Sequence, residues 1–170
     1  MILPPGALFS ACDTYRYLLW RHWADGPFCC FIMLNPSTAD ATRNDPTVRR
    51  CIGFAKSWGF AGLDVVNIFA LRSTDPKVLR KHADPIGPDN DEAIRVAVRR
   101  CHLVVCAWGN YGRLHDRGTK VLLSLQAMGV RPVCFKLTKD TTRKPGQPEH
   151  PLYQQARPLS AMQTLAVVPR

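Results

Sequence analysis

The sequence lacks the signatures of several large protein classes. Its 170 residues contain no apolar run long enough to cross a bilayer. The first residues also lack the basic start and apolar core of a secretory signal. No Walker A, G-x-G-x-x-G, G-x-S-x-G or H-E-x-x-H pattern is present, so several common enzyme classes are unsupported. We therefore expect a cytoplasmic protein without a membrane partner, folded as one domain over residues 1–170.

Paired cysteines are also missing, because none of the seven cysteines forms a C-x-x-C pair. This spacing argues against a zinc or iron–sulfur site. Most of the cysteines lie in apolar stretches, where cysteine behaves as a small buried residue. We expect reduced thiols, no metal and no other cofactor.

Acidic residues are few, with 13 Asp and Glu against 23 Lys and Arg, and the formal net charge is +10. Such a charge favours a polyanionic partner, although it can also serve solubility alone. The basic residues are not gathered in a tail but spread over several predicted loops and helix starts. We expect a monomer that binds DNA, single- or double-stranded.

One stretch, residues 28–40, organises the rest of the chain. It begins as an aromatic-rich apolar run, typical of a buried strand, and ends abruptly at Asn35-Pro36. Proline has no N–H for a sheet and favours extended geometry in the residue before it, so Asn35 should follow the strand's carboxyl end. In open α/β sheets ligands bind at this edge. The alternative is an ordinary turn followed by a helix cap.

Strand-like and helix-like segments alternate after residue 28. Apolar runs predict strands near residues 29–34, 63–68, 103–107 and 132–136. Asp45-Pro46 and Asp75-Pro76 are typical helix starts, and further helices are expected near 89–100 and 117–128. This alternation predicts an α/β fold, a three-layer α/β/α domain with a central, mostly parallel four-stranded sheet. Residues 7–10 and 15–20 are expected to add an N-terminal β-hairpin.

Polar side chains gather at the predicted carboxyl edge. Asn35 and Asn67 end two strands, and an amide there can orient a water or bind a heterocycle, although asparagine is also a common turn residue. His150 lies between two prolines in a long basic loop, which suits a donor to a developing oxyanion or an ordinary exposed histidine. Asp40 and Asp45 are either caps or carboxylates that polarise a water.

Three aromatic residues near this edge, Phe69, Trp108 and Tyr153, could stack on a nucleobase. The alternative is burial in the core, which is common for aromatic residues at strand ends.

Three short stretches carry a family resemblance. Met33-Leu34-Asn35-Pro36-Ser37 resembles the G-I-N-P-G motif of the mismatch-specific branch of the uracil-DNA glycosylases, and His150-Pro151-Leu152 resembles the H-P-S motif of that superfamily. Val66-Asn67-Ile68 is similar to the strand that carries its base-reading asparagine. Ser37 stands in place of the motif glycine and Leu152 in place of the serine, and no residue matches the aromatic under uracil. The resemblance covers about residues 28–160.

The resemblance implies a uracil-DNA-glycosylase-like fold and a role for each matching residue. Asn35 would position the attacking water, Asn67 would read the flipped base, and His150 would stabilise the leaving base. Leu152 and Tyr153 would press into the duplex. The expected catalytic residues are thus Asn35 and His150, and the expected substrate-binding residues are Asn67, Phe69, Pro36, Ser37, Trp108, Leu152 and Tyr153.

The whole chain also resembles a bacterial and phage family of unknown function, through L-N-P-S-T-A-D, N-D-P-T, N-x-F-A-L-R and G-x-P-x-H-P-L-Y. We therefore expect a DNA-repair hydrolase that excises a damaged or modified, uracil-like base. Two alternatives stay open at this point. One is a glycosidase or transferase acting on free nucleosides or nucleotides, and the other is a module that binds a modified base in DNA without cutting.

Overall fold

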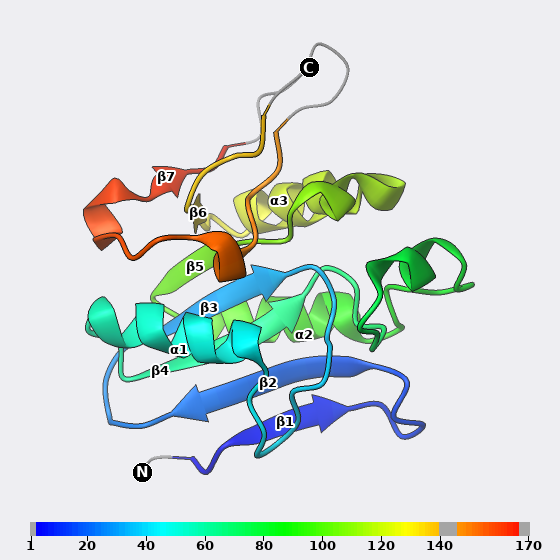
Figure 1. Ribbon diagram of the computed structural model, residues 1–170, viewed down its shortest axis with the longest axis horizontal. Coiled ribbons are helices and arrows are strands. Elements are labelled where there is room, and N and C mark those ends of the chain that lie inside the picture. The colour runs from blue at the N-terminus through cyan, green and yellow to red at the C-terminus, as the bar shows by residue number, and fades with distance from the viewer. Residues whose placement is uncertain (1–2, 140–145, 167–170) are drawn as a thin grey trace.

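Among the described residues, seven strands form one mixed sheet in the order β1-β2-β4-β3-β5-β6-β7 (Figure 1). The computed structural model describes residues 3–139 and 146–166. The strands are β1 (Gly6–Phe9), β2 (Arg16–His22), β3 (Phe28–Met33), β4 (Gly62–Asn67), β5 (Leu103–Cys106), β6 (Val133–Cys134) and β7 (Gln163–Thr164).

The four strands predicted as parallel are parallel, in the order β4-β3-β5-β6. The predicted number of four strands is nevertheless too low, because the sheet in the described residues has seven. The N-terminal hairpin β1–β2 joins the same sheet, because β2 pairs antiparallel with β4, and β7 adds an antiparallel strand beside β6. Short polar segments such as β7 carry no apolar alternation, so sequence patterns do not reveal them.

Helices cover both faces of the sheet (Figure 1). One face packs against α1 (Pro46–Ser57), and the other packs against α2 (Asn90–Arg100) and α3 (Arg117–Ala127). In the described part of the chain, four 3-10 helices lie in the connections: η1 (Pro76–Arg80), η2 (Asn110–Asp116), η3 (Pro151–Tyr153) and η4 (Leu159–Ala161). The expected three-layer α/β/α arrangement is therefore present.

The helix starts follow from local chemistry. Asp45 caps α1 by accepting a hydrogen bond from Val48 N at 2.8 Å, with Pro46 at the first helical position. The helix ends at Ser57, and Gly59, two residues beyond, has a φ of +81° that favours glycine. Asp75 caps the short helix η1 in the same way, through Lys77 N at 2.9 Å.

Two apolar clusters form the core, one on each face of the sheet. β3 contributes to both, because its residues alternate between the faces and all but the first are buried. Among the described residues, no helix has the length and apolar character needed to cross a membrane.

Candidate functional site at the carboxyl edge of the sheet

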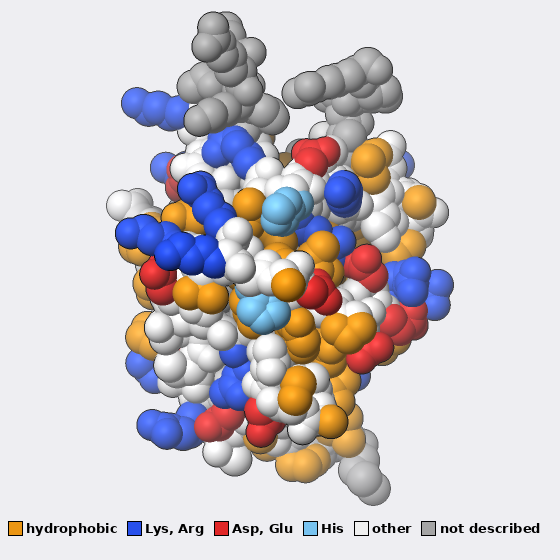
Figure 2. Space-filling view, turned by 90° about the vertical axis from the view of Figure 1, so that its right-hand side faces the viewer, with side chains coloured by type: hydrophobic (Ala, Val, Ile, Leu, Met, Phe, Trp, Pro, Cys, Tyr) orange, Lys and Arg blue, Asp and Glu red, His pale blue; other side chains and the backbone are white. Residues whose placement is uncertain are grey.

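The direction in which the chain adds parallel strands to the sheet changes between β3 and β5: β4 lies on one side of this pair and β6 on the other. From β3 the chain passes over α1 to β4, whereas from β5 it passes over α3, on the opposite face, to β6. Diverging connections of this kind leave a crevice at the strand carboxyl ends, where open α/β sheets bind ligands. Figure 2 faces this edge, where two histidines and several apolar side chains are surrounded by Lys and Arg side chains with acidic side chains among them.

Asn35 follows β3 and clamps two loops together. Its Nδ2 donates to Ser73 O at 2.8 Å, to Pro36 O at 3.1 Å and to Leu71 O at 3.5 Å. The loops after β3 and β4 are thereby joined, which agrees with the turn interpretation of this residue. The same clamp fixes the direction of Oδ1, for which the described residues provide no hydrogen-bond donor.

Asn67 is the last residue of β4 and is 1% exposed. Its Oδ1 accepts from Arg16, whereas its Nδ2 is buried and has no hydrogen-bond partner among the described residues. An unpaired buried polar group costs about 1–3 kcal/mol, so such a group is uncommon and calls for a specific explanation.

A β-bulge brings Arg16 to Asn67. The register between β1 and β2 shifts just after Arg16, leaving Tyr17 as an extra residue. Bulges re-aim side chains and are frequent next to active sites. Arg16 Nη1 donates to Ala39 O at 2.8 Å and Nη2 donates to Asn67 Oδ1 at 3.4 Å, so its guanidinium lies under the loop after β3.

Arg16 is a buried cation, with 2% of its surface exposed. Burial lowers the pKa of Arg16 to about 10, with Asp45 opposing the shift and Arg72 and Arg21 adding to it. No carboxylate lies within ion-pair distance of Arg16 in the described part of the chain. Its Nε is also buried and has no hydrogen-bond partner within residues 3–139 and 146–166. The carboxyl edge therefore has a buried guanidinium, that of Arg16, and two buried N–H donors without a partner in the described residues, Arg16 Nε and Asn67 Nδ2.

His150 is held beside the end of β5. Glu149 N donates to Lys136 O at 3.0 Å, and Gly109 N donates to Pro148 O at 2.7 Å, so the loop is fixed to the strand exits on either side. His150 Nδ1 accepts from Leu152 N at 3.3 Å. Because Nδ1 accepts, Nε2 carries the proton of the neutral ring. Burial lowers the pKa of His150, and Asp45 opposes the shift.

The short helix η3 follows His150 and packs against α1. Its Tyr153 is 81% exposed and Leu152 is 40% exposed. Arg50 of α1 donates to Gln154 O and so anchors the end of this segment. Two apolar side chains are thus presented to solvent on an anchored loop.

Phe69 and Trp108 are placed differently from Tyr153. Phe69 is fully buried and Trp108 is 1% exposed, both in the core cluster that packs against α2 and α3. In this arrangement neither ring face is open to a ligand. Pro36 is buried and its carbonyl accepts from Ser73 N at 2.9 Å, whereas Ser37 is partly exposed in the same loop.

Asp40 and Asp45 have the local roles expected of caps. Asp40 Oδ1 accepts from Arg43 N at 2.7 Å and Thr42 N at 2.9 Å, and these backbone bonds lower its pKa. Asp45 caps α1, as described above. Both carboxylates have a structural explanation, although Asp45 also acts on Arg16 and His150.

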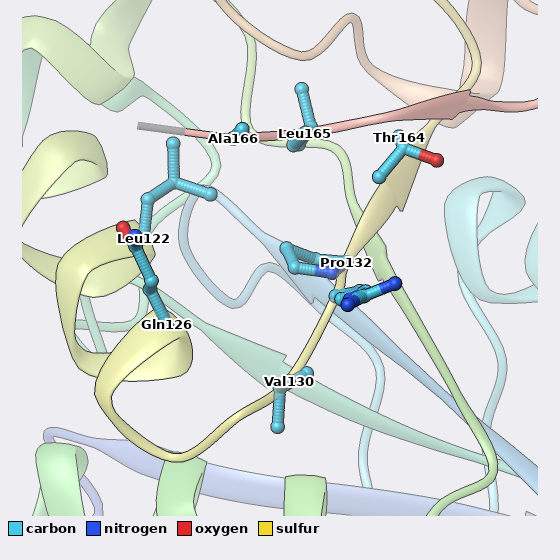
Figure 3. Close-up of a pocket in the computed structure, with 8 residues that line it drawn as sticks. Leu122, Gln126, Val130, Pro132, Thr164, Leu165 and Ala166 are labelled. Carbon is cyan, nitrogen blue, oxygen red and sulfur yellow. The ribbon is translucent and has the colours of Figure 1, made fainter. Parts of the chain in front are cut away.

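A cavity of about 350 Å³ lies at the opposite edge of the sheet (Figure 3). Its walls come from α3, from the segment leading into β6 and from the segment after β7, with Leu122, Val130, Pro132 and Leu165 among them. It contains none of the predicted site residues. No group of three or more His, Cys, Asp or Glu suited to a metal occurs in the described residues.

Sequence reasoning missed Arg16. An arginine in an amphipathic hairpin is predicted to be exposed, because arginine is almost never fully buried without a partner. The sequence holds one local sign of the bulge. Polar and apolar residues alternate imperfectly from Tyr15 to Trp20, as they do in a bulged strand.

The sheet and its helices define a mixed α/β protein, with Asn35, Asn67 and His150 near the carboxyl ends of its parallel strands. A family model described as "Protein of unknown function (DUF1643)" matches residues 16–152, and the chain belongs to this family. The match begins at Arg16 and ends at Leu152, so it includes every residue of the edge except Tyr153. No curated protein and no solved structure gives a significant match.

Proposed function

We propose that this protein hydrolyses the N-glycosidic bond of a modified, uracil-like base flipped out of DNA. The observation that carries the proposal is the buried Asn67 amide, whose unpaired Nδ2 lies at the same edge as Asn35 and His150. An enzyme that acts on a base must receive it in a pocket and bind its polar edge.

The reaction needs no strong nucleophile, because bond cleavage passes through an oxocarbenium-like sugar. It needs a placed water and a stabilised leaving base. Asn35 is anchored through Nδ2, so its oxygen can accept from a water in a fixed direction. His150 holds a proton on Nε2 while its ring is neutral, and it can donate to the oxyanion that develops on the base.

The charge of the protein supports a DNA substrate. The net charge is +10, and Arg43 and Arg49 are exposed beside the start of α1, next to the loop that covers Arg16. Cations bind phosphates with release of counterions, so DNA affinity should fall steeply with salt. Free-nucleoside turnover would change little with salt, which separates the first alternative activity from this one.

The test is a screen of oligonucleotides that carry uracil, hypoxanthine or hydroxymethyluracil, in single and double strands, followed by alkaline cleavage of abasic sites. Free nucleosides are assayed in parallel. The proposal predicts strand cleavage for at least one altered base. Nucleoside turnover without abasic sites would assign the edge to nucleoside chemistry, and DNA binding without product would assign it to recognition alone.

A further inference from the structure

The contact between Arg16 and Asn67 fixes which end of the amide is available. A guanidinium has N–H donors and no acceptor. The amide group of Asn67 must therefore turn its oxygen to Arg16, at 3.4 Å, and its nitrogen away from it. Rotation of the amide by 180° would set its N–H groups against those of Arg16.

The backbone of Asn67 is held as firmly as its side chain. Asn90, which is fully buried, donates through Nδ2 to Asn67 O at 2.9 Å and to Ile68 O at 3.2 Å. Arg117 donates to Ile68 O at 2.8 Å. The end of β4 is thus fixed from the opposite face of the sheet, and the direction of the Asn67 side chain is determined by rigid neighbours.

We propose that Arg16 is a positioning residue that sets the polarity of the Asn67 amide and makes this subsite specific for a keto oxygen. The inference rests on the proposed function for its ligand class, a nucleobase. The unpaired Asn67 Nδ2 and Arg16 Nε are both donors, so the subsite pairs with an acceptor and opposes an amino group. Both atoms are buried, so the residues that cover them must move to admit a ligand.

Uracil and cytosine are suitable probes, because C4 carries a keto oxygen in uracil and an amino group in cytosine, while N3 is protonated only in uracil. With selectively ¹⁵N-labelled asparagine side chains, NMR reports the Asn67 Nδ2 resonance directly. Titration with each free base, in the full-length protein, should move this resonance with uracil at lower concentration than with cytosine. A preference of roughly tenfold or more is expected from one buried mismatched donor.

Four variants separate positioning from mere structural support. Arg16→Lys keeps a donor-only side chain and should keep the preference for uracil, whereas Arg16→Gln can donate or accept and should bring the preference close to one. Asn67→Asp removes the donor and with it the labelled nitrogen, so binding by this variant is followed from backbone amide shifts, and its preference should reverse toward cytosine. Arg21→Gln is the matched control, since Arg21 lies on the same strand and donates to Asp40 O, but its hydrogen bonds within the described residues do not include Asn67.

The outcomes distinguish this inference from the proposed function. Equal binding of uracil and cytosine by the wild-type protein, or an unchanged preference in folded Arg16→Gln, overturns the role of Arg16 even if DNA bases are excised. No shift of the Asn67 amide with either base at millimolar concentration also overturns it. A keto preference that depends on Arg16, without any base release from DNA, supports this inference and overturns the glycosylase.

Discussion

Trp108 Nε1 donates to Gln147 Oε1 at 3.0 Å, across 39 residues of sequence. Both side chains are buried, and the bond joins the segment after β5 to the loop that carries His150. Gly112 and Gly118 make room for it, because a Cβ at Gly112 would lie 2.2 Å from Trp108 Cδ1, and one at Gly118 would lie 2.9 Å from Trp108 Nε1. The position of His150 therefore depends on tight packing beneath its loop.

Gly112→Ala should destabilise the protein by about 1–3 kcal/mol, because the added methyl overlaps the buried Trp108 ring. Chemical denaturation measures the change. Gly53→Ala is the matched control, since Gly53 lies in α1 and a Cβ added there would meet no atom within 4 Å. This control should be neutral or stabilising by up to about 1 kcal/mol. Equal stability of the two variants would contradict the packing described here.

Asp45→Ala should lower the free energy of unfolding by about 0.5–2 kcal/mol, because the cap on Val48 N is lost. Asp45→Asn retains a capping oxygen and should be nearly as stable as the wild type. Base release by Asp45→Asn should also stay near the wild-type rate. A stable Asp45→Asn protein that releases base on the order of a hundredfold more slowly would instead make Asp45 a catalytic acid or base.

His150 should make stability depend on pH. Burial lowers its pKa below the ordinary 6.5, so the unfolded chain binds a proton here that the folded protein does not. Stability from the neutral ring is present above pH 6.5 and is lost as the pH falls toward the folded pKa. Protonation at Nδ1 would also break the bond from Leu152 N.

His150→Gln should therefore flatten the plot of unfolding free energy against pH between about pH 7.5 and 5. Urea denaturation at several pH values measures both slopes. Parallel curves for the wild type and the variant would mean that His150 titrates in the folded protein as it does in the unfolded chain.

Tyr153→Ala should leave stability within about 0.5 kcal/mol, because the side chain is 81% exposed. If the ring stacks on DNA, the substitution should weaken binding by about 1–3 kcal/mol. Phe69→Ala is the contrasting case, with an expected loss of about 3–5 kcal/mol of stability from a fully buried core position. Fluorescence anisotropy with a labelled oligonucleotide, beside thermal denaturation, measures both effects. Unchanged DNA affinity in Tyr153→Ala would remove this residue from the binding surface.

Local sequence signals predicted much of the fold. Asp45-Pro46 marks the start of α1 because capping and proline geometry act within a few residues, and the apolar runs locate all four parallel strands. The attachment of β2 to β4 was not predicted, since strand pairing depends on contacts distant in sequence.

The site was predicted less completely than the fold. Asn35 and Asn67 fall at strand ends, as expected, because Pro36 and the apolar runs determine where the strands end. The burial of Arg16 depends on a bulge and on a loop that closes over it, and neither leaves a composition signal. The difference between the buried Trp108 and the exposed Tyr153 is likewise a property of packing.

The most direct measurement is the single-turnover rate of base release, on the best oligonucleotide from the screen, by Asn35→Ala and His150→Ala. Each substitution should slow the chemical step on the order of a hundredfold while DNA affinity stays nearly unchanged. Asn110→Ala is the control, because Asn110 is exposed at the same edge and bonds only Arg113 and Thr138 among the described residues. Full rates in both folded variants would contradict the assignment of this edge as the site of glycosidic cleavage.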